Sequence, residues 1–392
     1  MADCHLGSWN SHPELKELPL EAFEIAIDES LKQKVDFILI AGDLFDTAVP
    51  PIDVIKFTVT QLNRCKLENV PVYVIAGSHD FSPTGKTMLS VLEEAELLTD
   101  LTLKDTETNS YLIKGMVGKK GSLEETLFDN DMRKDCENQI SKTEKFKIFL
   151  FHSAVKEFSN PLMSSIPIKD LPACFDYYAT GHVHKIIHEK IGESNIVFPG
   201  PTFPANFTEL EELGCGGFYI VKYSPPDENV KQNTQLEYIP IKLCDTVLFE
   251  IDANNRTADE INSEIVRKLN TKLDGKIVLL KITGVLKTGR SSDINLKAIS
   301  DIAKNNGARC LKKNIHITER DAREITTSSM VVEIENELIE KNIGHSKIFS
   351  KEQEKDILHK IMNILKEEKG EAEVKRVFEE RLIENALKVI GV

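Results

Sequence analysis

Four short apolar runs in the first half of the chain each end in polar or glycine residues, and this pattern constrains the fold more than any other feature. The runs span residues 35–43, 70–78, 146–152 and 175–182. Such runs are typical of buried strands, whose polar ends then meet at one edge of a sheet. Residues 20–33 and 52–65 lie between the first runs and have the apolar spacing of amphipathic helices. The alternation predicts an α/β fold.

The rest of the chain predicts three further parts. A turn-rich stretch at residues 224–229 interrupts the first pattern. A smaller βα pattern follows, with strands expected near 246–251 and 277–282 and helices near 258–273 and 295–305. The predicted parts are a large α/β domain, a small α/β capping domain, a polar linker and a helix–loop–helix, at residues 1–242, 243–322, 323–350 and 351–392.

The polar residues that open the chain and end the apolar runs are types that bind divalent metals. They form five groups in order: Asp3-x-His5, Gly42-Asp43, Ser78-His79-Asp80, His152 and His182-x-His184. Asp and neutral His are ligands that Mn²⁺, Fe²⁺ or Zn²⁺ accept. Two such ions can bind both the attacking and the leaving oxygens of a phosphodiester. One short motif is weak evidence, but five groups in this order predict a two-metal phosphodiesterase site.

This series of groups resembles the calcineurin-like metallophosphoesterases. More narrowly, the chain is similar to the nuclease subunit of the DNA double-strand-break repair complex, the SbcD and meiotic-recombination-eleven type. The segments that carry the narrower resemblance are DCHLG, GDLFDTAVPP, FDYYATGHVHK and FPGPTFPANFTE, at residues 3–7, 42–51, 175–185 and 198–209. The resemblance implies a two-sheet sandwich flanked by helices, then a small capping domain and C-terminal helices.

The resemblance also implies a set of metal ligands and two Mn²⁺ ions per subunit. The ligands would be Asp3, His5 and His184 for one ion, His152 and His182 for the other, and Asp43 as the bridge between them. The family usually has Asn where this chain has Ser78. Because a hydroxyl is a poorer ligand than an amide oxygen, Ser78 would ligate directly, act through water, or leave the second metal weakly held.

Two neighbouring residues would act without binding metal. The resemblance gives His79 the task of stabilising the pentacoordinate phosphate or protonating the leaving 3′ oxygen. It gives Asp80 the task of orienting His79 or a ligand. A helix N-cap or a turn is an equal alternative for Asp80 and for Asp46.

The start of the chain departs from the family pattern, because only Met1 and Ala2 precede Asp3. In the family a strand runs ahead of the Asp-x-His motif. Without that strand, backbone groups of the neighbouring strands would be left unpaired. We therefore expect the natural chain to start upstream of Met1.

The charge distribution bears on DNA binding. The net charge of −14 argues against a nucleic-acid partner when taken alone, but residues 276–320 hold ten Lys and Arg against three Asp and Glu. A solvated face is the plain alternative. The resemblance favours DNA contacts from this stretch and from the residue after the last motif: Lys287, Arg290, Lys312, Lys313 and Lys185. Trp9, beside His12, would stack on a base or simply pack.

The cysteines and the N-terminus indicate a cytoplasmic protein. Seven cysteines are scattered without a CxxC pair, so we expect neither a disulfide framework nor a zinc ribbon. No signal peptide is visible, and no apolar stretch reaches the length of a membrane helix.

The last forty residues predict two amphipathic helices separated near Gly370. Two helices leave an apolar face open, which docks either on the chain's own large domain or on a partner. The resemblance names an SMC-like coiled-coil ABC ATPase of the SbcC type as that partner. We expect Phe378 and Leu382 to be anchors in its groove, and the resemblance also implies a homodimer.

The sequence as a whole predicts a metal-dependent DNA nuclease that processes DNA ends. The implied activities are 3′→5′ exonuclease on duplex ends and endonuclease on single strands. One rival is a small-molecule phosphodiesterase or phosphatase with the same metal centre. The other is a catalytically weak scaffold that tethers DNA to a partner.

Overall fold

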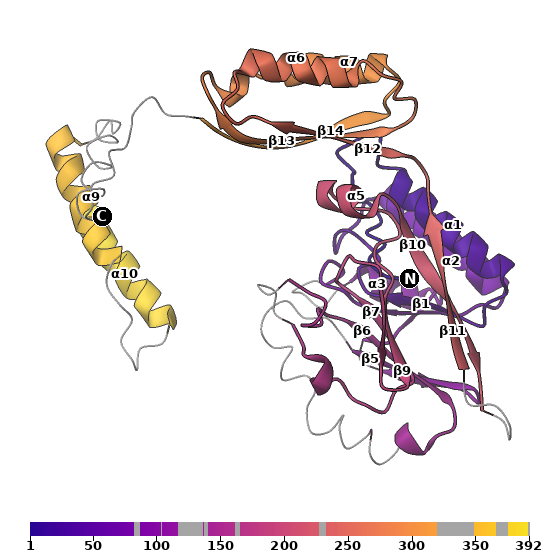
Figure 1. Ribbon diagram of the computed structural model, residues 1–392. Coiled ribbons are helices and arrows are strands. Elements are labelled where there is room, and N and C mark those ends of the chain that lie inside the picture. Colours follow the sequence, from indigo (N-terminus) through magenta and orange to yellow (C-terminus); the bar gives the residue numbers. More distant parts are fainter. Residues whose placement is uncertain are drawn as a thin grey trace. The chain divides into compact units, whose positions relative to one another are not determined.

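The computed structural model describes residues 1–81, 87–102, 104–116, 136, 140–160, 165–226, 233–319, 349–365 and 375–390. The chain divides into two compact units, Met1–Glu319 and Arg320–Val392. The first unit has the predicted α/β architecture (Figure 1). The predicted boundary between residues 242 and 243 falls inside this unit, and it stays a prediction. Of the predicted linker 323–350, all but residues 349 and 350 lie outside the described residues.

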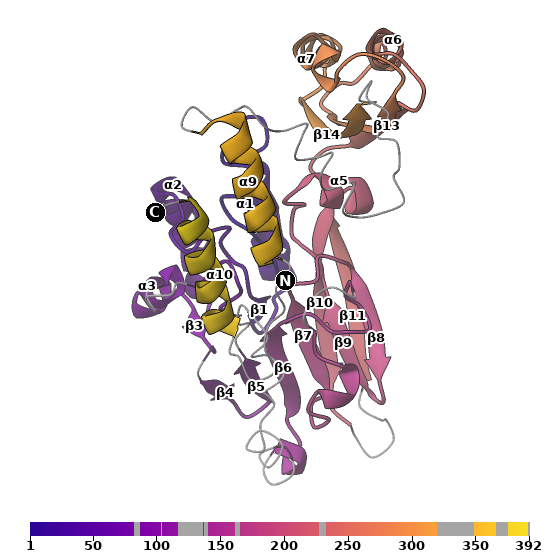
Figure 2. The same cartoon turned by 90° about the vertical axis from the view of Figure 1, so that its left-hand side faces the viewer.

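A six-stranded sheet forms one layer of the first unit. Its strands run in the order β4 (Asp105–Glu107), β5 (Tyr111–Met116), β6 (Phe146–His152), β7 (Tyr177–Gly181), β9 (Ser194–Phe198) and β8 (Ile187–Ile191). The four inner strands are parallel, and the two edge strands are antiparallel to their neighbours. Every residue of β7 is buried, as expected for a strand covered on both faces. Figure 2 shows β7 between β6 and β9 in this sheet.

A three-stranded parallel sheet forms part of the second layer. It contains β1 (Ile38–Ala41), β2 (Val72–Ile75) and β3 (Thr99–Asp100). Its outer face packs on α1 (Leu18–Lys32), α2 (Ile52–Leu67) and α3 (Met88–Glu94) through a buried apolar cluster. Its inner face packs on β6 and β7, where Ala41 and Ile75 join Ile148 and Tyr177 in a second cluster. The predicted sandwich flanked by helices is therefore confirmed.

The second layer is split, which the sequence did not predict. β10 (Gly216–Ser224) and β11 (Asn233–Ile241) form a separate antiparallel sheet. In the described part of the chain, β1 pairs only with β2, and β10 only with β11. A cavity of about 1000 Å³ lies between them, lined by apolar residues such as Phe37, Tyr177 and Phe218. None of the predicted metal ligands lines this cavity.

The capping part is a parallel three-stranded sheet covered on one face by two helices (Figure 1). Its elements are β12 (Thr246–Asp252), α6 (Ala258–Leu269), β13 (Ile277–Leu286), α7 (Leu296–Asn305) and β14 (Cys310–Glu319). A capping box between Thr257 and Glu260 starts α6. The opposite face of the sheet packs on the large α/β domain. In the buried cluster that the two parts share, Leu279 joins Leu15 and Phe203. This shared cluster explains why both parts form one compact unit.

The described residues of the first unit include four further short helices. They are α5 (Phe207–Leu213) and the 3₁₀ helices Ile140–Lys142, Ile168–Asp170 and Ser291–Asp293. In the second unit, α9 (Lys351–Leu365) and α10 (Lys375–Ile390) pack against each other, which confirms the two predicted helices. Gly370 lies outside the described residues. No helix in the described part of the chain is long and apolar enough to span a membrane.

One cysteine prediction is wrong. The structure joins Cys136 and Cys174 in a disulfide across 38 residues of sequence. No motif marks this pair, because the contact is made by the fold and not by local spacing. The remaining cysteines are free, and three of them are buried.

Candidate metal centre

The candidate ligands after the first motif lie at the C-terminal ends of strands, as the sequence predicts: Asp43, Ser78 and His182 follow β1, β2 and β7, and His152 ends β6. The segment from Asp3 to Leu6 runs beside the loop after β1, where Asp3 N–H donates to Gly42 and His5 N–H donates to Asp43. Four ligand residues have left-handed backbones, namely Asp3, His5, Asp43 and His182, with φ of 49°, 42°, 50° and 82°. This conformation costs a non-glycine residue roughly 1–2 kcal/mol. Such strain is typical of functional sites that the surrounding structure holds in place.

Two glycines allow the ligand loops to approach each other closely. A Cβ atom on Gly42 would lie 2.2 Å from Nδ1 of His152. A Cβ atom on Gly77 would lie 2.2 Å from Oδ1 of Asp43. Both positions therefore exclude any side chain, and Gly42 also has a φ of +83° that favours glycine.

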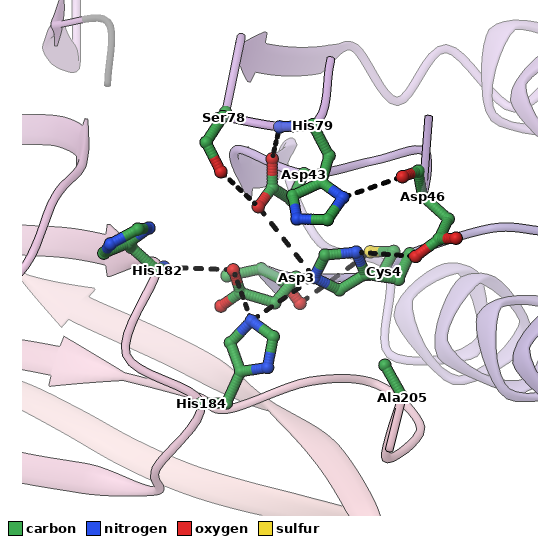
Figure 3. Close-up of polar contacts among 12 residues, drawn as sticks. Asp3, Cys4, Asp43, Asp46, Ser78, His79, His182, His184 and Ala205 are labelled. Atoms are coloured by element: carbon green, nitrogen blue, oxygen red, sulfur yellow. Dashed lines mark hydrogen bonds and ion pairs between the residues drawn. The ribbon is translucent and has the colours of Figure 1, made fainter. Parts of the chain in front are cut away.

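Asp3, His5 and His184 form a first cluster of ligand atoms. The Nε2 atoms of the two histidines lie 3.3 Å apart, and Nε2 of His184 lies 3.5 Å from Oδ1 of Asp3. Figure 3 shows His184 and the Asp3 carboxylate facing each other. Asp3 and His5 are buried, whereas His184 is partly exposed. The cluster is therefore open to a ligand on the side of His184.

Asp3, Asp43 and His152 form a second cluster that shares Asp3 with the first. One oxygen of Asp43, Oδ2, lies 3.2 Å from Nε2 of His152 and 3.9 Å from Nε2 of His5. The same carboxylate thus faces a histidine of each cluster. This geometry fits the bridging role proposed for Asp43, because a carboxylate between two sets of ligands can serve both.

Two predicted ligands of the second metal are less well placed. His182 belongs to neither cluster. Its backbone N–H lies 3.0 Å from Oδ1 of Asp3, and its ring packs edge-on against His152, with centroids 5.1 Å apart. Figure 3 shows its ring turned away from Asp3 and Asp43. Ser78 Oγ lies 3.4 Å from Oδ2 of Asp43, a long hydrogen bond. Direct ligation by His182 and by Ser78 stays a proposal.

His79 lies beside the clusters and is held at two points. Its backbone N–H donates to Oδ1 of Asp43 at 2.7 Å, and its ring Nδ1–H donates to the carbonyl oxygen of Asp46 at 2.7 Å (Figure 3). Because a carbonyl only accepts, the proton of the neutral ring is on Nδ1 and the Nε2 lone pair is free. The exposed ring also packs edge-on against His5, with centroids 4.7 Å apart. His5, Asp46 and His79 could themselves hold an ion.

Asp80 holds the backbones of two loops, and the orienting role predicted for it stays a proposal. Its carboxylate accepts three backbone N–H groups, from Leu44, Phe45 and Gly77, at 3.0–3.1 Å. It therefore fastens the loop after β1 to the loop after β2. Burial and the neighbouring charge of Asp43 raise the pKa of Asp80 to about 6 despite these bonds. The turn role is the one supported by these contacts.

The buried carboxylates and histidines strongly perturb one another. Burial alone would lower the pKa of His152, but the close carboxylate of Asp43 and the charge of Asp3 raise it to about 9. Burial also opposes the shift at His184, yet Asp3 and Glu209 raise its pKa to about 11. Burial, followed by the charge of His152, lowers the pKa of His182 to about 4. Without metal, the site therefore holds two protonated histidines among carboxylates.

Sequence reasoning missed Glu209, which touches the site from α5. Its Oε1 lies 2.7 Å from Nδ1 of His184, on the side of the ring opposite to Asp3. Only 7% of Glu209 is exposed. The residue closes the FPGPTFPANFTE segment, and its offset of three from Asn206 is also that of an ordinary helix start. Asp46 is similarly placed behind His5, with Oδ1 at 3.4 Å from Nδ1.

Several buried polar atoms of the site have no hydrogen-bond partner within the described residues, and this suits the binding of divalent cations. In the described part of the chain, Oδ2 of Asp3, Nδ1 of His5 and Nε2 of His152 are buried and make no hydrogen bond. Such orphaned atoms are rare and require an explanation. Carboxylate oxygens and imidazole nitrogens are also the ligands that Mn²⁺ and similar ions accept. The residues present therefore suit one or more such ions.

The predicted DNA contacts separate into two kinds. Lys185, Lys287, Arg290 and Lys313 are exposed, and none forms a salt bridge within the described residues. Lys312 differs, because its Nζ lies 2.9 Å from Nε2 of His12 and 4.4 Å from the centroid of the Trp9 ring. Lys312 thus joins β14 to the loop after the first ligands.

Trp9 and Lys312 therefore have a packing role in this structure. The indole N–H of Trp9 donates to the carbonyl of Pro204 at 2.9 Å. The packing alternative for Trp9 is the one that these contacts support. Of the predicted tail anchors, Leu382 is half-buried on α10. The side chain of Phe378 lies outside the described residues.

Comparisons with known proteins identify the same chemistry. The profile of the calcineurin-like phosphoesterase family matches residues 1–186. The chain is 28% identical over 340 residues to the DNA double-strand break repair protein Mre11 of Methanococcus maripaludis, which covers 83% of this chain and 88% of that protein. It is 26% identical over 267 residues to Mre11 of Methanocaldococcus jannaschii, covering 65% and 71%.

A solved structure adds little to this comparison. The crystal structure of the protein TT1561 from Thermus thermophilus covers 47% of this chain and 84% of its own, at 17% identity and a TM-score of 0.36. The family match, these relatives and the strand-end clusters agree. Over residues 1–186 the chain is similar to the calcineurin-like phosphoesterases, and over most of its length it is similar to archaeal proteins named Mre11.

Proposed function

We propose that this chain is a nuclease that uses two Mn²⁺ ions to hydrolyse phosphodiester bonds at DNA ends. The single observation that carries the proposal is the pair of overlapping ligand clusters that share Asp3, with Asp43 between their histidines. Sharing of this kind suits two adjacent ions better than one isolated ion. The relatives named as DNA double-strand break repair proteins support DNA as the substrate.

The proposed division of labour follows from the contacts. Asp3, His5 and His184 would hold one ion, and His152 with His182 and Ser78 the other. Asp43 would contact both ions. When bound, the cations would draw charge from the phosphate and make water acidic enough to ionise near neutral pH. Asp80 would keep the two ligand loops in register through its three backbone bonds.

His79 would complete the reaction from outside the ligand clusters. Its ring is exposed, and the carbonyl of Asp46 fixes its orientation. With Nδ1 engaged, Nε2 is the atom that faces a substrate. When protonated there, His79 would hand a proton to the leaving 3′ oxygen or donate to the crowded phosphate.

Exposed Lys and Arg side chains on the capping part favour DNA over a small phosphodiester as the substrate. Lys287, Arg290 and Lys313 lie on the capping part, are exposed, and form no salt bridge within the described residues. Such residues would contact backbone phosphates independently of sequence. We propose exonuclease action on duplex ends and endonuclease action on single strands.

Exposed apolar residues support two partner surfaces. Val49, Ile52 and Leu67, on and before α2, are 81%, 84% and 72% exposed. We propose the start of α2, with Val49 and Ile52, as the homodimer contact, because exposed apolar side chains that lie together mark partner surfaces. Leu67 lies at the other end of the same helix. On α10, Ile383 and Leu387 are also exposed. We propose that the two tail helices dock on an SMC-like coiled-coil ABC ATPase.

The test of the proposed function compares two substrates under the same conditions. The purified chain would be assayed in Mn²⁺ and in Mg²⁺ on an end-labelled DNA hairpin and on bis-nitrophenyl phosphate. The proposal expects Mn²⁺-dependent cleavage of the hairpin. Cleavage of the small ester alone would instead identify a small-molecule phosphodiesterase. Binding of DNA without metal uptake or cleavage would identify a scaffold.

A further inference from the structure

The two candidate metal positions differ in what lies behind their histidines. Nδ1 of His184 contacts the carboxylate of Glu209 at 2.7 Å, and Nδ1 of His5 faces the carboxylate of Asp46 at 3.4 Å. Nδ1 of His152, by contrast, donates to the neutral carbonyl oxygen of Ala41 at 2.8 Å. In the Asp3–His5–His184 cluster, both histidines therefore have a carboxylate near Nδ1. At the other position, Nδ1 of His152 bonds to a neutral carbonyl.

Glu209 is the better fixed of these two supporting carboxylates. Its Oε2 accepts the backbone N–H of Ala205 at 2.8 Å, and its Oε1 also contacts the Asn206 side-chain amide. Its own N–H donates to Asn206 Oδ1 at 3.0 Å, which places Glu209 in the first turn of α5. Because the residue is buried and bonded on both oxygens, its carboxylate cannot swing away from His184.

This contact determines which nitrogen of His184 is available. A carboxylate accepts the proton on Nδ1, so the Nε2 lone pair is directed at Asp3 and His5. A carboxylate partner also makes the imidazole a stronger donor to a metal than a carbonyl partner does. At the second position, Nδ1 of His152 donates to the neutral carbonyl of Ala41, and Oδ1 of Asp3, itself a candidate ligand, lies 3.8 Å from it. This position also includes the turned-away His182 and the hydroxyl of Ser78.

We propose that Glu209 is a positioning residue that makes the Asp3–His5–His184 position the tighter of two unequal metal positions. The inference depends on the metal centre of the proposed function. It predicts that this position fills first and that the position at His152 fills only at higher metal concentration. Such a chain would carry one retained ion and one exchangeable ion.

The main alternative is that Glu209 only starts helix α5. Two comparison variants separate these roles. Glu212→Gln changes an exposed carboxylate on the same helix and touches no ligand. Asn206→Ala removes the N-cap of α5 and one contact to the Glu209 carboxylate, but it keeps the Glu209 bond to the Ala205 N–H and the carboxylate that faces His184.

The experiment titrates metal-free full-length protein with Mn²⁺ and follows the free ion by its electron paramagnetic resonance signal. Wild type should bind in a tighter and a weaker class. Glu209→Gln should weaken the tighter class by about 10–100-fold and leave the weaker one within error. Glu212→Gln should match wild type. Asn206→Ala should lower the melting temperature but keep the tighter class.

Three results would overturn the inference. One is a Glu209→Gln titration that superimposes on wild type. Another is a Glu209→Gln variant in which both classes bind Mn²⁺ more weakly to the same degree, with the same loss of affinity in Asn206→Ala. That result would mean that Glu209 acts only as a helix cap. The third is a wild type with two equal classes. A wild type that binds no Mn²⁺ at all would instead remove the proposed function itself, and the two failures are thus distinguishable.

Discussion

Replacement of His79 by alanine tests the proposed catalytic step apart from metal binding. The side chain makes one hydrogen bond, to the carbonyl of Asp46, and the ring is exposed. Its loss should therefore cost stability only near the low end of about 0.5–1.5 kcal/mol. The backbone N–H that holds Asp43 remains in the variant. The Mn²⁺ affinity should accordingly stay within about tenfold of wild type. Mutation of a residue that hydrogen-bonds to a ligand typically lowers metal affinity about 10–100-fold, and the loss of a ligand itself would lower it further.

The catalytic cost should be much larger. Groups that move protons in a transition state contribute about 10²–10⁴ in rate, which corresponds to about 3–5 kcal/mol of activation free energy. The assay measures single-turnover cleavage of an end-labelled duplex at saturating Mn²⁺. His188→Ala, which removes another exposed histidine, is the matched control and should cleave like wild type.

A second substrate separates the two roles considered for His79. Nitrophenolate leaves without needing a proton, whereas a 3′ oxygen of DNA needs one. If His79 donates the proton, His79→Ala should lose far more activity on DNA than on bis-nitrophenyl phosphate. Equal losses would indicate stabilisation of the crowded phosphate. Wild-type cleavage by His79→Ala, or loss of one Mn²⁺ ion, would refute the assignment, and the latter would make His79 a ligand.

The remaining predictions concern protons, DNA and the tail. Because the pKa values of His152 and His184 are raised to about 9 and 11, Mn²⁺ binding at pH 7 should release about two protons. Calorimetry in two buffers measures that release; no release would contradict it. Conversely, the metal-free fold should lose stability as pH rises from about 6.5 through 9, as melting curves would show. Lys313→Ala should weaken DNA binding and reduce the salt slope by about 0.9. Lys312→Ala should lower the melting temperature instead. Weaker DNA binding in Lys312→Ala alone, with a lower melting temperature in Lys313→Ala alone, would be inconsistent with the structure. Deletion of residues 351–392 should abolish co-purification with the ATPase and preserve Mn²⁺-dependent cleavage. Undiminished binding of the truncated chain to the ATPase would show that the tail is not the docking element.

The sequence predicts the positions of the strand ends well because the runs there are locally encoded. Residues 146–152 form β6 with the predicted bounds, since an uninterrupted apolar run is typical of a strand buried on both faces. The α2 helix begins at the predicted residue, Ile52, and α1 begins two residues before the predicted Leu20. Short edge strands such as β8 have no such signal, because three of its five residues are exposed.

The details of the site depend on contacts that the sequence does not encode locally. Glu209 reaches His184 across 25 residues, and Asp80 reaches Leu44 across 36. Neither contact has a spacing rule. The orientation of His182 likewise depends on its own left-handed backbone, which a GHxH motif does not reveal. The metal ligands could be proposed from motif and resemblance, but their supporting residues required coordinates.

The most direct test of the central claim counts metal ions and measures cleavage on the same preparation. Full-length protein and Asp43→Ala would be equilibrated with Mn²⁺, freed of excess ion, and assayed for bound metal and for cleavage of a DNA hairpin across Mn²⁺ concentrations. Asp43 faces a histidine of each cluster, so its loss should affect both positions. The account predicts up to two ions per wild-type chain, cleavage that appears as the second ion binds, and neither binding nor cleavage in a folded Asp43→Ala. Undiminished Mn²⁺-dependent cleavage by Asp43→Ala would contradict it.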